Sequence, residues 1–300
     1  MIRVANAPCS WGVIEKTYEG DRSYGYDRVI NEMRETGFAG TELGDWGFMP
    51  TDPAILKAEL NRRNLSLIAS WVTAVLIEPE GHADSADRAV QAAHLLADVG
   101  GDQPVIVVGD NLFAYEARNK IVGRVTPADG MTAEQWQIFV DGVHHIARRV
   151  KEEAGLRTVF HPHCSTWIEA PHEIVKLLDL TDPELVGLCL DTGHYRFGGG
   201  DPVAAVHQHA DRIRHVHFKD CEPTIATQAR EEGWTYNLAV GQGLFCELGQ
   251  GEVDFAAVLH ELNAINYDGW VVIEQDVLPS MGTPKQAAQR NRNYLRGIGL

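Results

Sequence analysis

The sequence contains no run of about 18 uninterrupted apolar residues, the length that a membrane-spanning helix needs. It begins without a basic segment followed by a long apolar one, so we expect no secretory signal. No GxGxxG opens a helix after the first apolar run, and no P-loop or GxSxG motif is present. These absences predict a cytoplasmic protein and argue against a dinucleotide fold, a P-loop and a serine-hydrolase elbow.

Basic residues are scarce, because 26 lysines and arginines stand against 42 aspartates and glutamates, a formal net charge of −16. Binding to nucleic acid needs a basic surface that neutralises phosphates. The same negative charge would be repelled by an anionic membrane. We therefore expect neither a nucleic acid nor a membrane as a partner.

Cysteines are few, odd in number and widely separated, and no two of them form a CxxC pair. The five are Cys9, Cys164, Cys189, Cys221 and Cys246. We expect reduced thiols rather than disulfides or a zinc knuckle.

Short apolar runs with little alternation recur along the chain, separated by segments with helical periodicity. We predict eight strands, at Ile2–Ala7, Phe38–Leu43, Leu65–Val72, Pro104–Val108, Arg157–His161, Val186–Leu190, Ile213–Phe218 and Trp270–Glu274. The predicted helices are Tyr26–Thr36, Ala54–Asn64, Ala86–Val99, Ala133–Ala154, Glu173–Leu180, Pro202–His209, Phe255–Asn263 and Thr283–Arg296. Eight alternations are typical of an α/β fold of the (β/α)8 TIM-barrel type. No linker or repeat divides the chain, so we expect one domain over residues 1–300.

Two connections are longer than a barrel needs, from Gly109 to about Met131 and from Cys221 to Gly251. Both leave the C-terminal ends of predicted strands. We expect them to lie over the barrel mouth, as a lid or as part of a contact in a homo-oligomer.

Ionisable side chains follow the sixth, seventh and eighth predicted strands, at Asp191, His217 and Glu274. In a barrel these strand ends converge on one sector of the catalytic face. Carboxylates and imidazole with water positions left open suit Mn²⁺, Co²⁺, Mg²⁺, Fe²⁺ or Zn²⁺. The sequence therefore predicts an enzyme with a divalent-metal site.

The fourth ligand is open at this point, because the fifth strand ends in HPHCSTWIE. We expect Glu169 to fold back to the metal, although it is also placed to cap the helix near Pro171. His161 and His163 are expected to line the pocket as hydrogen-bonding or proton-transfer groups, although either is an alternative ligand.

Further polar and aromatic residues stand at predicted strand ends and are expected to contact the substrate or orient the ligands. On one side they are His194, Lys219 and Asp220. On the opposite wall they are Trp11, Glu42, Trp46 and Trp71, which would offer aromatic faces and one carboxylate to a ring-shaped ligand.

An ordered series of motifs resembles the inosose dehydratase family of the xylose-isomerase-like barrel superfamily. These motifs are APCSWGV at Ala7–Val13, GTELGDWGFMP at Gly40–Pro50, LDTGH at Leu190–His194, HVHFKD at His215–Asp220, LGQGEVDF at Leu248–Phe255 and VVIEQDVL at Val271–Leu278. The resemblance runs from about residue 4 to about residue 296. One departure is Ser165-Thr166, where similar sequences carry Gly-Thr.

The resemblance implies a TIM barrel with a divalent metal, commonly manganese or cobalt, that dehydrates 2-keto-myo-inositol (scyllo-inosose) in inositol catabolism. The superfamily's ligands after the sixth, seventh and eighth strands map onto Asp191, His217 and Glu274. As catalytic groups we expect Glu274 or Glu169 as the base, and a histidine among His161, His163 and His194 as the acid. A metal-dependent sugar isomerase or epimerase is the alternative, because both reactions begin with the same proton removal. A sugar-binding barrel without turnover is a third reading.

Overall fold

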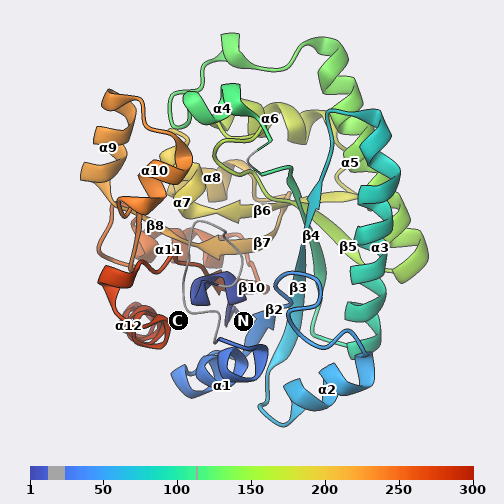
Figure 1. The fold of residues 1–300 in the computed structure, drawn as a ribbon, viewed down its shortest axis with the longest axis vertical. Helices are drawn as coiled ribbons and strands as arrows, with labels where there is room; N and C mark the ends of the chain where they lie inside the picture. The colour runs from blue at the N-terminus through green and yellow to red at the C-terminus, as the bar shows by residue number, and fades with distance from the viewer. Residues whose placement is uncertain (13–23, 113) are drawn as a thin grey trace.

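The computed structural model of the protein describes residues 1–12, 24–112 and 114–300. Val13, the last residue of the Ala7–Val13 motif, and Phe113, in the first long connection, lie outside the described residues. Eight parallel strands form a closed barrel in the order β1-β10-β7-β6-β5-β4-β3-β2, with helices around it (Figure 1). The predicted (β/α)8 fold is thereby confirmed.

All eight predicted strands are present. The predicted bounds Ile213–Phe218 are confirmed, and each of the other seven has at least one end that differs by one or two residues. The strands are β1 (Arg3–Asn6), β2 (Gly40–Glu42), β3 (Ser66–Ala74), β4 (Val105–Asp110), β5 (Arg157–Phe160), β6 (Val186–Asp191), β7 (Ile213–Phe218) and β10 (Trp270–Ile273). The closing pair aligns Arg3 with Trp270 and Asn6 with Ile273. This parallel register brings the C-terminal ends of all strands to one mouth of the barrel.

The eight predicted helices are also present, and two of them, α1 (Tyr26–Thr36) and α5 (Ala133–Ala154), have the predicted bounds. The others are α2 (Pro53–Asn61), α3 (His82–Val99), α6 (Pro171–Leu180), α8 (Pro202–Gln208), α11 (Phe255–Ala264) and α12 (Pro284–Gly297). Side-chain caps fix two of the starts, because Asp52 accepts a hydrogen bond from the Ile55 amide and Thr132 accepts one from the Gln135 amide. A short helix that was not predicted, α7 (Thr192–Phe197), directly follows β6.

The apolar core has two layers. Alternate strand residues, such as Val4, Leu188 and Val216, pack in one large cluster with the helices. The residues between them form two small clusters that contain no α-helix residue: Ala5, Ala7, Ile68, Trp270 and Val272, and Ala69, Val105, Val107, Val159 and Cys189. These small clusters fill the barrel interior, because successive side chains of a strand point to opposite faces.

The two long connections lie together at the mouth of the barrel (Figure 1). The first contains α4 (Glu116–Lys120) and the short 3-10 helix Pro127–Asp129. The second contains α9 (Pro223–Glu232), α10 (Tyr236–Gly241) and a two-stranded antiparallel sheet of β8 (Asp220–Cys221) and β9 (Phe245–Cys246). They share a small apolar cluster and are joined by a hydrogen bond from Arg230 Nε to the Gly123 carbonyl.

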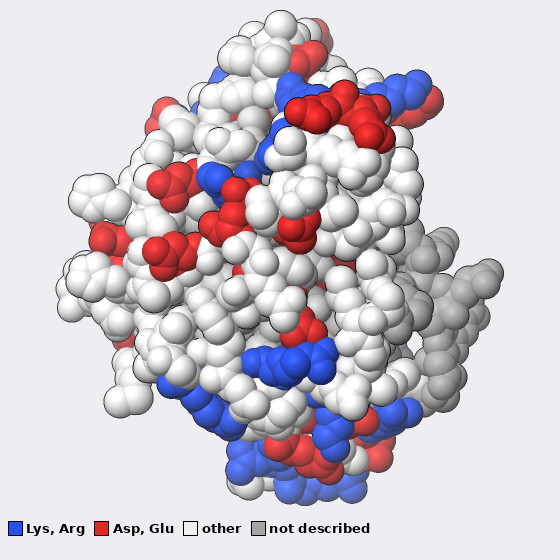
Figure 2. All heavy atoms as spheres, turned by 90° about the vertical axis from the view of Figure 1, so that its left-hand side faces the viewer, with Lys and Arg blue, Asp and Glu red and all other residues white. Residues whose placement is uncertain are grey.

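The face that carries α9, α10 and α12 shows acidic and basic side chains interspersed with uncharged areas (Figure 2). In the described part of the chain, no helix is both long and apolar enough to cross a membrane.

Candidate metal centre at the mouth of the barrel

Four ionisable side chains from consecutive strand ends meet at the centre of the barrel mouth. His161 follows β5, Asp191 ends β6, His217 lies on β7 and Glu274 follows β10. One ligand atom from each residue lies within 4.8 Å of the others. The outward neighbours Phe160, Leu190, Phe218 and Ile273 pack against the helices, so strand alternation turns these four side chains inward.

The contacts within this group are those of ligands that surround one point. Asp191 Oδ2 lies 3.6 Å from His161 Nε2 and 3.9 Å from His217 Nδ1, and His217 Nδ1 lies 3.3 Å from Glu274 Oε1. Asp191 Oδ2 and His217 Nδ1 are buried, and neither makes a hydrogen bond to any described residue. Buried polar atoms without partners are costly, and a cation satisfies both. Two carboxylates and two imidazoles therefore fit a divalent metal ion, and they do not select one metal.

Glu42 lies beneath this group and orients His217. Its Oε1 atom accepts hydrogen bonds from Nε2 of His215 at 2.8 Å and from Nε2 of His217 at 3.0 Å. A carboxylate only accepts, so the Nε2 atoms carry the protons and Nδ1 of His217 stays available as a ligand. Burial raises the pKa of Glu42, but the charge and hydrogen bonds of His217 and His215 outweigh burial and lower it to about 2. The structure thus places Glu42, a predicted substrate contact, in a hydrogen bond with His217, a candidate ligand.

The ionisable side chains of this buried group shift one another's pKa values. Burial would lower the pKa of His217, but Cys189, Glu274 and Glu42 raise it well above its usual value. Burial would raise the pKa of Glu274, but His217 and Lys219 lower it well below its usual value. The carboxylates are therefore charged. In the absence of a cation His217 carries a second proton, on Nδ1, and a metal bound there would displace it.

Glu169, predicted as a metal ligand and possible base, does not belong to this group. Its carboxylate accepts hydrogen bonds from the backbone amides of Ser165 and Gly123, both at 2.6 Å. Burial raises its pKa to about 7, although these hydrogen bonds oppose the shift. Glu169 does not cap α6 either, because Glu173 accepts the hydrogen bonds from the backbone amides of Glu169 and Ala170 at the start of that helix. The structure brings His161, the alternative ligand, to the group in its place.

Two other predicted histidines form a wall beside the metal group. The rings of His163 and His194 lie 3.8 Å apart, and Tyr236 from α10 covers both of them. His163 Nδ1 donates to the Cys164 carbonyl at 2.8 Å, so its Nε2 atom accepts from the Tyr236 hydroxyl at 3.4 Å. Burial, reinforced by the charges of His161 and Lys219, lowers the pKa of His163 to about 3. His163 is therefore neutral near neutral pH.

Two further residues predicted from the sequence, Trp71 and Lys219, lie beside the group. The Trp71 ring stands edge-on to His161, with centroids 5.1 Å apart. It lies across Gly109 on β4, where a Cβ atom would come within 2.0 Å of the indole. Lys219 Nζ is 3.3 Å from Glu274 Oε2 and 3.5 Å from His194 Nε2, over the ring of Phe245.

Three predicted substrate contacts lie elsewhere. Asp220 is surrounded by four backbone amides, because its two oxygens accept hydrogen bonds from Cys221, Gly249, Gly251 and Val253. Its carboxylate thereby holds the LGQGEV turn. Trp11 is 2% exposed and donates from Nε1 to Glu32 on α1, so it packs between the barrel and that helix. Trp46 is 46% exposed on the loop after β2.

Comparisons with known proteins agree with this architecture. A family model described as "Xylose isomerase-like TIM barrel" matches residues 30–298. Inosose dehydratase from Geobacillus kaustophilus is 32% identical over 298 residues, which cover 98% of this chain and 93% of that protein. Inosose dehydratase from Bacillus licheniformis is 34% identical over 89% of this chain and 86% of that protein. The chain belongs to the inosose dehydratase family, within the xylose isomerase-like TIM barrels.

Solved structures share the fold of this family member at low sequence identity. The apo form of the 3-keto-D-glucoside 4-epimerase YcjR from E. coli is 18% identical, covers 99% of this chain and 100% of its own, and has a TM-score of 0.71. The probable 3-DHS dehydratase AsbF from Bacillus anthracis is 16% identical, with coverages of 98% and 99% and a TM-score of 0.71. The IOLI protein with a bound zinc atom is 14% identical, with coverages of 99% and 98% and a TM-score of 0.71.

The departure at Ser165 has a structural consequence. Its φ angle is 73°, a left-handed conformation that glycine adopts freely and other residues adopt at a cost. The turn directs the Ser165 amide at Glu169, while the Ser165 hydroxyl is buried without a partner among the described residues. Serine is therefore strained at this position, which favours glycine.

Several residues beside the site were given no site role from the sequence. His215, Tyr236, Phe245 and Asp276 all contact predicted site residues. One signal was present for His215, because alternation in His-Val-His-Phe-Lys directs positions 215, 217 and 219 to one face of β7. Tyr236 and Phe245 come from a long connection whose path periodicity does not determine.

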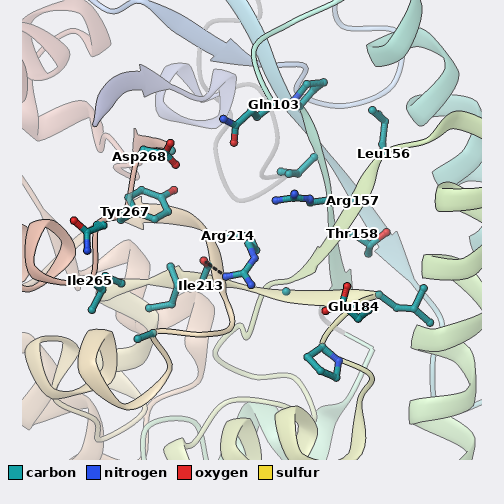
Figure 3. Close-up of a pocket in the computed structure, with 18 of the residues that line it drawn as sticks. Gln103, Leu156, Arg157, Thr158, Glu184, Ile213, Arg214, Ile265, Tyr267 and Asp268 are labelled. Carbon is teal, nitrogen blue, oxygen red and sulfur yellow. Dashed lines mark hydrogen bonds between the residues drawn. The ribbon is translucent and has the colours of Figure 1, made fainter. Parts of the chain in front are cut away.

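A separate cavity of about 750 Å³ opens at the other end of the barrel (Figure 3). It is lined by residues at the N-terminal ends of the strands, including Val105, Arg157, Gly187 and Ile213. The exposed side chains of Arg157 and Arg214 extend into it. In barrel enzymes catalytic groups stand at the C-terminal ends, so we assign the chemistry to the buried group at the mouth.

Proposed function

We propose that the protein is a metal-dependent hydro-lyase that dehydrates 2-keto-myo-inositol in inositol catabolism. The observation that carries this proposal is the convergence of His161, Asp191, His217 and Glu274 at the mouth of a barrel whose relatives are inosose dehydratases. The near-full coverage of those relatives supports a common reaction, since the matched segment includes every strand end that supplies the group.

We propose that these four residues hold one divalent ion, with manganese and cobalt as the first candidates. The two unpartnered buried atoms, Asp191 Oδ2 and His217 Nδ1, support this role. A divalent ion there would supply positive charge that stabilises the negative charge that develops on the substrate's carbonyl oxygen.

The surrounding residues are suited to moving protons. Glu274 is a charged carboxylate whose Oε2 atom faces Lys219 rather than the metal group, so it is placed to take the proton from the carbon beside the ketone. His163 and His194 stand next to His161 and form the wall along which the hydroxyl group would leave. The proton that Glu274 has taken up leaves with it, so that one water is released and the carboxylate is regenerated. Loss of that hydroxyl gives an enol, and the enol becomes a dione when its other carbon gains a solvent proton.

The test is to supply metal-loaded protein with 2-keto-myo-inositol in D₂O and to follow the product by NMR, with a panel of ketohexoses in parallel. We expect a dione that carries one solvent deuterium at the carbon that lost the hydroxyl group. An isomerised or epimerised sugar with its water retained would replace this proposal with the isomerase alternative. Binding of the keto-inositol without proton exchange or dehydration would favour the sugar-binding reading.

A further inference from the structure

Asp276 has one carboxylate oxygen without a hydrogen bond to the described residues, at the mouth of the barrel. It lies two residues beyond Glu274, and its side chain is 17% exposed. The Oδ2 atom is buried and makes no hydrogen bond to the part of the chain that the structure describes. The cation that faces it is Lys219, whose Nζ atom is 3.7 Å away, beyond hydrogen-bonding distance.

Lys219 is itself held in place by other groups. Its Nζ atom lies 3.3 Å from Glu274 Oε2 and 3.5 Å from His194 Nε2, over the Phe245 ring at 4.8 Å. Lys219 therefore remains fixed whether or not Asp276 contacts it closely. The gap between Lys219 Nζ and Asp276 Oδ2 is that of a long ion pair, in which the ammonium donor and the carboxylate acceptor make no hydrogen bond to each other.

One small group satisfies both sides of this gap. A hydroxyl oxygen accepts a hydrogen bond from an ammonium group while its proton is donated to a carboxylate. Hydrogen bonds to charged groups are also the stronger ones in proteins. A polyol offers several such hydroxyl groups, whereas an apolar ligand would leave Asp276 Oδ2 without a hydrogen-bond partner.

We propose that Asp276 and Lys219 together bind one hydroxyl group of a cyclic polyol, and that Asp276 selects for substrates that carry this hydroxyl. The inference rests on the proposed function and extends it, because it assigns a specificity residue that the proposed chemistry does not use. It makes Asp276 a substrate-binding residue rather than a positioning residue for Lys219.

The experiment combines variants of the enzyme with analogues of the substrate, in the manner of a double-mutant cycle. Wild-type protein, Asp276→Asn and Asp276→Ala are assayed with 2-keto-myo-inositol and with analogues that each lack one hydroxyl group. With the full substrate we expect kcat/KM to fall about 10- to 100-fold in Asp276→Ala, mostly through KM, as for a lost hydrogen bond to a charged group. For the one analogue that lacks the contacted hydroxyl, wild type and variant should be equal.

A purely structural role gives a different pattern. If Asp276 only positioned Lys219, the ratio of wild type to variant would be the same for every analogue, and the proposal would be overturned. Asp276→Asn keeps the side-chain volume and guards against misfolding in the alanine variant. Asp268→Asn, an exposed carboxylate at the opposite cavity, is the matched control and should leave all values unchanged.

Failure of the proposed reaction is separated by measuring binding alone. myo-Inositol and its deoxy analogues are titrated into wild type and Asp276→Asn by calorimetry. Suppose that no keto-inositol turns over, but that Asp276→Asn has a higher Kd than wild type for every polyol except one deoxy analogue. The proposed reaction then fails, and the proposed hydroxyl-binding site stands. Equal Kd values in wild type and variant, or no binding of any polyol, would overturn the inference itself.

Discussion

The two ends of the barrel differ in how far their ionisable side chains are buried and hydrogen-bonded. At the C-terminal mouth, His161, Asp191 and His217 are each no more than 2% exposed, and atoms of all three lack hydrogen bonds to described residues. At the N-terminal end, Arg214 is exposed and donates to the carbonyls of Ile213 and Asp211. Burying ionisable groups without full compensation is destabilising, so a folded protein retains them where a ligand or a reaction needs them.

The same difference explains why the cavity at the N-terminal end is not the proposed site. The cavity of about 750 Å³ at the N-terminal end is bordered by exposed groups such as Glu184 and Asp268. Water already solvates these side chains, so they gain little from a bound ligand. The buried group at the mouth gains most from a cation, and this contrast carries the proposed function.

The largest expected effect is the difference in activity between a variant at the mouth and a variant at the N-terminal end of the barrel. We expect Glu274→Gln to lower kcat by about 10²- to 10⁴-fold, because it removes the proposed base and one charge of the metal group. Glu184→Gln, an exposed carboxylate at the other end, should leave kcat unchanged. Steady-state assays of both variants measure this, and comparable losses in both would remove the functional distinction between the ends.

A smaller effect should come from the residue beneath the metal group. Glu42→Gln keeps the shape but removes the charged acceptor shared by His215 and His217. We expect metal affinity to fall about 10- to 100-fold, the usual cost of losing a hydrogen bond to a ligating histidine. Competition with a metal chelator measures the affinity. Unchanged affinity in a folded variant would mean that Glu42 does not orient His217.

The smallest effect concerns stability next to the site. Ser165→Gly should raise the free energy of unfolding by about 1 kcal/mol, because glycine relieves the left-handed strain and removes a buried hydroxyl without a partner. Denaturant unfolding measures the change. Thr192→Ser, in α7 on the next strand end, serves as a control because its hydroxyl retains the hydrogen bond to the Lys219 carbonyl. A destabilised Ser165→Gly would show that the serine hydroxyl has a stabilising role.

The sequence predicted the barrel well, because its strands and helices are marked by local patterns and caps. It also predicted Asp191, His217 and Glu274, since strand ends converge in this fold. Glu169 lies outside the group, and its position could not be foreseen because it depends on a turn at Ser165 and on Gly123 from another connection. Asp220 likewise depends on amides about 30 residues away, a long-range pairing that no local pattern reveals.

The most direct test of the buried metal site is calorimetric titration with Mn²⁺ and Co²⁺ of wild type, Asp191→Ala, His161→Ala and Glu169→Gln. Wild type and Glu169→Gln should each bind one ion, because Glu169 is bonded to backbone amides away from the group. Asp191→Ala and His161→Ala should lose most of the affinity while remaining folded. Full affinity in Asp191→Ala, or loss of binding in Glu169→Gln with retention in His161→Ala, would contradict the site.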